Sequence, residues 1–392
     1  MTAFFNTGLT QQQFLDEYWQ KKPLVIRQAF PLPVSDLTQE DLAAFAAEAE
    51  IESRLIEEFG DRPWQLQHGP FDEDDFAALP ETHWTLLVQD MDKHYPPLQK
   101  LLTAFDFIAD WRRDDVMISY APEGGSVGPH TDSYDVFLLQ AQGIRHWQIS
   151  DKPLADAVFR SDTDLRILQQ FSADQQWDLH PGDMLYLPPH YAHHGVALNP
   201  CLTFSVGFRA PSQLQLLDAF SHTLQEQDIA EQLYADGDTN AASSTTEIDD
   251  SAIKRFQNLL LKTITENADL MVLAVGRLVT ETKSTLQELA DEFIADKPSL
   301  AELDRRFNNG EYLQRNGYLC FAWHNDTAKA YLFVAGEAYS VELAAVETLS
   351  WLTTQSQIDQ KDWQQLRKYP VLADVFCELI AEGAFYWPED FS

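Results

Sequence analysis

The sequence predicts an α+β protein with a β-barrel or sandwich in its N-terminal half, followed by helices and a small mixed unit. Three observations carry this prediction. Short β-type runs separated by Gly and Pro fill residues 116–207. Amphipathic helical patterns with a polar linker between them follow in residues 215–289, and then a hairpin pattern with short helices. The length of 392 residues also exceeds that of one ordinary domain.

Helices and one strand are expected before the barrel. Thr10 is a plausible N-cap for a helix that carries Phe14, Tyr18 and Trp19 on one stripe. The segment KKPLVIRQAF then predicts a strand entered after a proline. In the barrel region, VMISYAPEGGSVGPHTDSYDVFLLQAQGIRHWQIS contains three candidate strands, and DMLYLPPHYAHHGVAL and CLTFSVGFRA supply more.

The chain turns helical after Pro211. QLLDAFSHTLQEQDIAEQLYA is amphipathic, and the polar stretch DGDTNAASSTTEIDDS after it has linker composition. The next helix repeats apolar residues at Ile253, Phe256, Leu260 and Ile264 on one face. Such a face fits either a dimer interface or packing within the chain.

The C-terminal part predicts a compact α+β module. YLCFAWHNDTAKAYLFVAG has the pattern of a hairpin with HNDTAK as its turn, and helices are expected in VELAAVETLSWLTT, QKDWQQL and VLADVFCELIAEG. A hairpin with short helices is compatible with a winged helix. Because the module lacks a clear basic stripe, we expect it to contact protein or serve a structural role.

The charge balance narrows the choice of partners. With 27 Lys and Arg against 62 Asp and Glu, the formal net charge is −35, which argues against direct nucleic-acid binding. It fits a basic protein partner or simply solubility. Three cysteines without a CxxC motif, no signal peptide pattern and no apolar run of membrane-spanning length predict a cytoplasmic protein without membrane contact.

The segment GPHTDSYDVF contains a candidate metal motif. His130 and Asp132 are separated by one residue, so on a strand they share one face with Tyr134. One distant histidine would complete a 2-His-1-carboxylate triad, which holds one side of Fe(II) and leaves positions open. The pair alone is a weak signal, because such a tripeptide arises easily by chance.

The third ligand is expected in HPGDMLYLPPHYAHHGVAL. His180 and His190 lie next to turn-forming prolines, whereas His193 and His194 are adjacent and must point to opposite faces of a strand. We select His193, because its alternating partners Gly195 and Ala197 are small and leave room for a ligand. For His190 and His194, a polar surface position or a supporting hydrogen bond is preferred.

The same alternation predicts the barrel lining. Three sets each share one face: Asp115, Met117 and Ser119; Gly143, Arg145 and Trp147; and Thr203, Ser205 and Gly207. A cation inside a barrel is costly unless it is paired. Arg145 therefore needs an anion, and a dicarboxylate such as 2-oxoglutarate suits it, unless Arg145 faces solvent instead.

These motifs together resemble the bacterial ribosomal oxygenases of the JmjC group. The resemblance rests on GPHTDSYDVFLLQ, GIRHW, PGDMLYLPPHYAHHGVAL and FSVGFRAP, and is joined by FLDEYWQKKPLVI and WQLQHGPF. It covers essentially the whole chain. It implies a double-stranded β-helix of the cupin and JmjC type in residues 1–210, a helical dimerisation region in residues 211–298 and a winged-helix-like domain in residues 299–392, assembled as a homodimer.

The resemblance also implies an activity. This activity is the hydroxylation of the β-carbon of an arginine in the sixteenth large-subunit ribosomal protein. It depends on Fe(II), 2-oxoglutarate and O2. The implied roles are metal ligation by His130, Asp132 and His193, cosubstrate binding by Arg145 and Ser119, and substrate binding by Asp115, Met117, Tyr134 and Ser205. The chain departs from its relatives at Thr203, where an asparagine is familiar, and at His194, where a glutamate is.

Other functions stay open on the sequence alone. The same iron site would serve a demethylase or an oxygenase acting on another protein residue or on a small molecule. A zinc or nickel cupin isomerase is also compatible. A non-catalytic cupin that only binds a partner is less favoured, because it would not need all four of His130, Asp132, His193 and Arg145.

Overall fold

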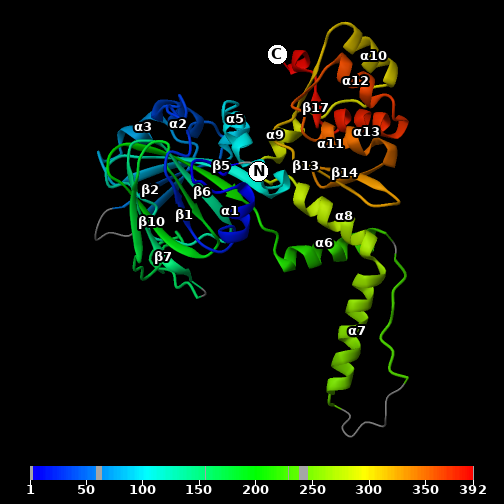
Figure 1. Ribbon diagram of the computed structural model, residues 1–392, viewed down its shortest axis with the longest axis horizontal. Helices are drawn as coiled ribbons and strands as arrows, with labels where there is room; N and C mark the ends of the chain where they lie inside the picture. Colours follow the sequence, from blue (N-terminus) through cyan, green and yellow to red (C-terminus); the bar gives the residue numbers. More distant parts are fainter. Residues whose placement is uncertain (1–2, 59–63, 155, 228, 238–245, 392) are drawn as a thin grey trace. The chain divides into compact units, whose positions relative to one another are not determined.

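The computed structural model describes residues 3–58, 64–154, 156–227, 229–237 and 246–391 (Figure 1). The chain divides into two units, Met1–Ala210 and Pro211–Ser392. Each unit has its own hydrophobic core, so the two are described separately. No helix in the described ranges is both long enough and apolar enough to cross a lipid bilayer.

The first unit is built around two antiparallel sheets. The larger has eight strands in the order β1-β9-β6-β11-β5-β4-β2-β3, and the smaller has three in the order β10-β7-β8. Their bounds are β1 Leu24–Ile26, β2 Ser53–Glu57, β3 Gln65–His68, β4 Trp84–Val88, β5 Arg113–Ala121, β6 Asp135–Gln142, β7 Arg145–Pro153, β8 Gln175–Leu179, β9 Met184–Leu187, β10 Tyr191–Ala197 and β11 Cys201–Phe208.

The inner faces of the two sheets share one apolar cluster. Val136 and Leu138 of β6 lie in it with Trp147 and Ile149 of β7, and all four are at most 5% exposed. Two facing sheets formed by alternating strands are the arrangement of a double-stranded β-helix, which confirms the fold class. The strand expected in KKPLVIRQAF is β1, at the edge of the larger sheet.

Helices pack on the larger sheet and build the main core of this unit. They are α1 Gln11–Glu17, α2 Gln39–Ala46, α3 Glu73–Ala77, α4 Met91–His94 and α5 Leu98–Leu102, with short 3-10 turns at Thr103–Phe105 and Asp110–Arg112. Thr10 caps α1 through a capping box with Gln13, as expected. Phe14 of this helix is fully buried against Tyr186 of β9.

One local prediction in the motif region was wrong. Residues 131–134 form no strand, and β6 begins only at Asp135. His130 makes an isolated β-bridge with His193 instead. Gly128, in the left-handed region at φ 80°, lies just before this bridge.

The second unit begins with helices. They are α6 Gln213–Glu226, α7 Asp250–Glu266, α8 Ala268–Thr280 and α9 Gln287–Asp291. The helix expected through residue 235 ends at Glu226, and residues 229–236 are irregular, so that prediction was too long. A Cβ on Gly276 of α8 would lie 2.3 Å from the ring of Phe333, so glycine lets α8 approach the C-terminal sheet closely.

The C-terminal part contains the predicted hairpin and helices. Its elements are α10 Leu300–Asn308, β12 Leu313–Arg315, β13 Phe321–Asn325, β14 Ala330–Val334, β15 Glu337–Val341, 3-10 turns at Leu343–Ala345 and Pro388–Phe391, α11 Val346–Leu352, β16 Gln357–Ile358, α12 Gln360–Leu366, α13 Pro370–Ala381 and β17 Phe385–Tyr386. Strands β13 and β14 pair as a hairpin, and β15 extends it to three strands.

Candidate metal centre and its pocket

Three side chains of the first unit form a cluster able to hold a metal ion. His130 and His193 belong to two separate segments that the isolated β-bridge joins, with N–H···O distances of 3.0 and 2.9 Å in the two directions. Asp132 lies in the loop before β6. One ligand atom from each of the three lies within 4.8 Å of the others. This is a 2-His-1-carboxylate arrangement.

Local hydrogen bonds orient both imidazole rings toward the centre of the cluster. Nδ1 of His130 lies 2.9 Å from the carbonyl oxygen of Gly128, and Nδ1 of His193 lies 2.9 Å from that of Tyr191. A carbonyl only accepts, so Nδ1 carries a proton, and in the neutral ring Nε2 is then the nitrogen with the free lone pair. The Nε2 atoms lie 4.0 and 3.5 Å from the Asp132 carboxylate.

Burial keeps His193 neutral. Its side chain is 2% exposed. Desolvation, with the nearby His130, lowers the pKa of His193 from 6.5 to about 4. A metal binds the neutral imidazole, so the ring is already in its ligating form at neutral pH.

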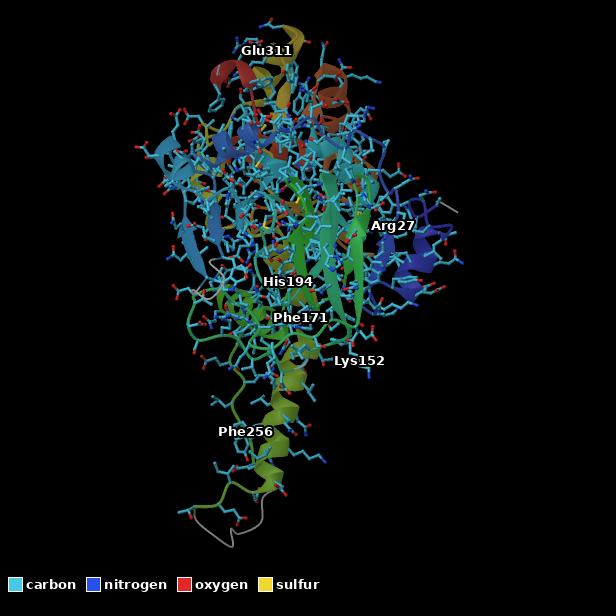
Figure 2. The ribbon with its side chains drawn as sticks, turned by 90° about the vertical axis from the view of Figure 1, so that its left-hand side faces the viewer. Arg27, Lys152, Phe171, His194, Phe256 and Glu311 are labelled. Carbon is cyan, nitrogen blue, oxygen red and sulfur yellow. The ribbon has the colours of Figure 1, made fainter. Side chains whose placement is uncertain are left out.

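The other three histidines of the segment do not join the cluster. His180 and His190 are exposed, and His190 sits in a turn at φ 67°. His194 points to the other face of β10, as expected, where its ring lies 6.2 Å from that of Phe171 (Figure 2). Its Nε2 is buried without a hydrogen-bond partner among the described residues, and burial lowers its pKa to about 4.

A small pocket of about 70 Å³ opens beside the cluster. It is lined by side chains of both sheets: Leu87, Met117, Ser119, Val127, His130, Asp132, Tyr134, Val136, Leu138, Arg145, Trp147, His193, Thr203 and Ser205. The structure thus brings together eight of the nine residues predicted for the site. The ninth is Asp115.

Arg145 is the most unusual group in this pocket. It is 3% exposed, so it faces the interior and not the solvent. Its Nε and Nη2 atoms, and Nε1 of Trp147, are buried and have no hydrogen-bond partner in the described part of the chain. The Arg145 guanidinium lies 5.8 Å from the Trp147 ring centre. These donors form a cationic, unsatisfied wall that fits a small anion.

The predicted role of the small residues on β10 was wrong. A Cβ on Gly195 would lie 2.7 Å from the Trp147 ring, so that ring takes the space expected to be open for a ligand. Ala197 does not line the pocket and lies opposite Arg145 in the β10–β7 pairing. The small side chains therefore make room for neighbouring side chains of β7.

Asp115 lies near the pocket without lining it. It is 6% exposed, and its Oδ1 is 3.2 Å from the position that a Cβ on Gly207 would take. Tyr134, which does line the pocket, is 37% exposed, and burial of its hydroxyl together with Asp132 and Asp115 raises its pKa. Carboxylates and an aromatic ring on this side of the pocket suit a cationic substrate group.

Sequence patterns did not reveal the side chains that support these residues. Nε2 of Gln89 donates a 2.9 Å bond to Asp115, and the Thr203 hydroxyl donates a 3.1 Å bond to Gln140. These pairs are 26 and 63 residues apart. Nothing in the periodicity of one segment signals a partner in another strand, so only the tertiary fold reveals them.

Comparisons with known proteins agree with this geometry. A family model described as JmjC domain matches residues 100–216. A probable ribosomal oxygenase of Haemophilus influenzae is 42% identical over 223 residues, which are 56% of this chain and 54%, about half, of the relative. The ribosomal protein uL16 3-hydroxylase of Escherichia coli is 35% identical over 262 residues, covering 67% of this chain and 69% of the relative.

Solved structures resemble almost the whole chain. The X-ray structure of Escherichia coli YcfD has a TM-score of 0.83 at 28% identity, with 97% of this chain and 98% of that chain covered. YcfD, a ribosomal oxygenase, in complex with cobalt and 2-oxoglutarate gives 0.79 at 26% identity over the same shares. Together with the His-Asp-His cluster, these matches show that the chain belongs to the JmjC-domain ribosomal oxygenase family.

Proposed function

We propose that this protein is an Fe(II)- and 2-oxoglutarate-dependent oxygenase that hydroxylates the β-carbon of an arginine in the sixteenth large-subunit ribosomal protein. The observation that carries the proposal is the His130, Asp132 and His193 cluster with the unsatisfied Arg145 in the same pocket. The Escherichia coli relative named a ribosomal protein uL16 3-hydroxylase supports the substrate class.

The residues present fit the metal and the cosubstrate. Two imidazole nitrogens and a carboxylate oxygen suit Fe(II) and leave positions open for other ligands. The orphaned nitrogens of Arg145 need an anionic partner, and the distal carboxylate of 2-oxoglutarate would satisfy them. When bound, iron and 2-oxoglutarate supply dioxygen activation, in which the cosubstrate becomes succinate and carbon dioxide while one oxygen atom enters a C–H bond.

The protein's own residues orient the metal, the cosubstrate and the substrate, and they exclude other side chains from the site. The Nδ1 bonds of His130 and His193 hold the rings in the ligating tautomer. Arg145 and the buried hydroxyl of Ser119 bind the cosubstrate, and Met117, Tyr134 and Ser205 surround the substrate side chain beside Asp115. Their aliphatic and aromatic walls suit the stem of an arginine, and their oxygen atoms suit its guanidinium.

The acidic surface supports a basic protein as partner. A net charge of −35 attracts an arginine- and lysine-rich ribosomal protein and speeds encounter at low salt. A ribosomal protein as substrate also supports the cytoplasm as the location of the proposed activity.

We further propose that the protein is a homodimer that uses α7. Ile253, Phe256, Leu260 and Leu261 of this helix are 47–61% exposed, although they are apolar. A stripe of this kind on one helix is typical of an interface between copies.

The test is a mass measurement. Purified protein is loaded anaerobically with Fe(II), 2-oxoglutarate and a peptide from the ribosomal protein, and air is then admitted. We expect a gain of one oxygen atom on arginine, which is lost in Asp132→Ala and kept in Asp236→Ala, an exposed carboxylate of the second unit.

Each alternative has its own result in this assay. Loss of a methylene from a methylated peptide would indicate a demethylase. Bound iron and 2-oxoglutarate without any change in peptide mass would refute the substrate. A protein that binds neither would contradict the oxygenase assignment.

A further inference from the structure

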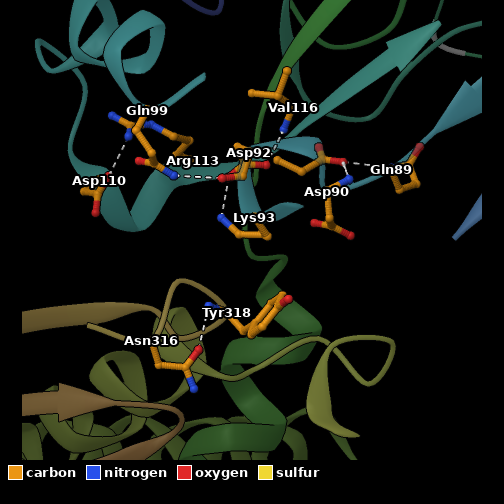
Figure 3. A network of polar contacts seen from close by, with 11 residues as sticks. Gln89, Asp90, Asp92, Lys93, Gln99, Asp110, Arg113, Val116, Asn316 and Tyr318 are labelled. Atoms are coloured by element: carbon orange, nitrogen blue, oxygen red, sulfur yellow. Dashed lines mark hydrogen bonds and ion pairs between the residues drawn. The ribbon is translucent and has the colours of Figure 1, made fainter. Parts of the chain in front are cut away.

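Two polar side chains from neighbouring segments, Arg54 and Gln89, support Asp115. Nη2 of Arg54 on β2 donates a 2.9 Å hydrogen bond to Oε1 of Gln89, and Nε2 of Gln89 donates a 2.9 Å bond to Oδ2 of Asp115 on β5 (Figure 3 shows Gln89). Arg54 has only donors, so the amide oxygen of Gln89 must face it. The amide nitrogen therefore faces the carboxylate, and the amide is fixed in one orientation.

The backbone around these side chains is also specialised. Asp90, directly after Gln89, adopts a left-handed conformation at φ 52°, which is uncommon for a residue other than glycine. This conformation directs its N–H to Oδ2 of Asp115 at 3.4 Å. On the next residue of β5, the N–H of Val116 donates a 2.8 Å bond to Asp92 (Figure 3). The Gln89 amide and the Asp90 N–H thus both donate to Oδ2 of Asp115.

A β-bulge directs Asp115 toward its neighbour strand. Val206 of β11 pairs with Val116 of β5, whereas Phe208 pairs with Arg113. Between these pairs, Asp114 and Asp115 lie opposite the single residue Gly207. Bulges next to active sites re-aim side chains in this way.

Gly207 lies beside the other carboxylate oxygen and an aromatic ring, and we call the space that these three residues border the slot. A Cβ built on Gly207 would lie 3.2 Å from Oδ1 of Asp115 and 3.8 Å from Cε2 of Tyr134. Any side chain at this position would occupy the space between the two. Ser205, two residues earlier on the same strand, lines the pocket beside the metal cluster.

We propose that Arg54 and Gln89 are positioning residues that aim Asp115 into this slot and thereby make the pocket select a guanidinium over a lysine ammonium. A guanidinium is flat, so it places N–H groups on Oδ1 while its face lies against the Tyr134 ring. An ammonium has no flat face for the slot. The inference rests on the proposed function, because it concerns how that substrate is chosen.

Binding without turnover tests this proposal. The full-length protein is loaded with Mn(II) and 2-oxoglutarate under anaerobic conditions. It is titrated calorimetrically with a short peptide that has one central arginine, and with the same peptide carrying lysine there. We expect the wild type to prefer the arginine peptide.

The variants separate positioning from general damage. Gln89→Leu should raise the Kd of the arginine peptide on the order of tenfold and change that of the lysine peptide less than about twofold. Arg54→Met should act in the same direction. The control Gln364→Leu, on the exposed face of α12, should change neither. The Kd of 2-oxoglutarate should stay at the wild-type value, whereas a merely structural role of Gln89 would weaken the binding of both peptides and of 2-oxoglutarate.

A second variant keeps the test valid if Gln89→Leu does not fold. Gly207→Ala fills the slot and should weaken the arginine peptide selectively. Equal binding of the two peptides by the wild type, or a full arginine preference in both Gln89→Leu and Gly207→Ala, would overturn the inference. Arginine selection by the Mn(II)-loaded protein, without oxygen transfer by the Fe(II)-loaded protein after air is admitted, would refute the proposed function alone and support the inference.

Discussion

Replacing Arg145 by methionine should have opposite effects on stability and on cosubstrate binding. Its guanidinium is buried, and two of its nitrogens have no hydrogen-bond partner in the described ranges. An unpaired buried cation costs several kcal/mol, and the contact with the Trp147 ring offsets about 1–2 kcal/mol of that. Methionine fills a similar volume without charge.

The expected changes in stability and in cosubstrate binding follow from these energies. We expect Arg145→Met to raise the free energy of unfolding of the ligand-free protein by about 2 kcal/mol, or about 4–8 °C in melting temperature for a unit of this size. The same substitution removes charge-assisted hydrogen bonds to the cosubstrate of about 1.5–3 kcal/mol, which corresponds to roughly 10- to 150-fold weaker binding.

The assay is thermal unfolding with Mn(II), with and without 2-oxoglutarate. The wild type should gain stability as the cosubstrate concentration rises above its Kd, whereas Arg145→Met should start higher and gain little. Arg166→Met, which removes an exposed arginine of the same unit, is the matched control. A variant that melts lower than the wild type and still responds fully to 2-oxoglutarate would refute the reasoning.

Three further predictions concern other parts of the molecule. Native His194 has a pKa of about 4 against 6.5 for the ordinary group, so the unfolded chain binds a proton first and stability falls as the pH drops from 6.5 to 4. Over this pH range, the free energy of unfolding of His194→Leu should fall by up to ~3 kcal/mol less than that of the wild type in denaturant titrations. Equal losses in the two proteins would contradict the lowered pKa of His194. Phe256→Asp on α7 should convert a dimer into a monomer of 44.7 kDa, as measured by light scattering. The control Asn258→Asp, on the opposite face of the helix, should leave the dimer intact, and a monomeric wild type would refute the proposed interface. Gly195→Ala should push the Trp147 ring away and cost about 1–3 kcal/mol in thermal unfolding, and an unchanged melting temperature would show that the ring moves freely.

Local chemistry let several features be predicted from the sequence. The Thr10 cap, the hairpin around residues 324–329 and the three strands between residues 113 and 153 follow from residue preferences within a few positions. Period-two alternation also placed Arg145, Ser119 and Ser205 on the pocket face correctly. His130, Asp132 and Tyr134 also line the pocket together, as alternation predicted, although residues 131–134 form no strand.

The sequence by itself determined which residue types were available: a His-x-Asp pair, one well-placed histidine and a cation in a barrel strand. Only the tertiary structure decided that the β-bridge joins His130 to His193 and that Trp147 takes the space over Gly195. It also decided that Gln89 links Arg54 to Asp115 by hydrogen bonds. The physical reason is the separation along the chain over which each interaction acts. Capping, turns and alternation act between near neighbours in the chain, whereas these contacts join strands that meet only when the two sheets close on a shared core.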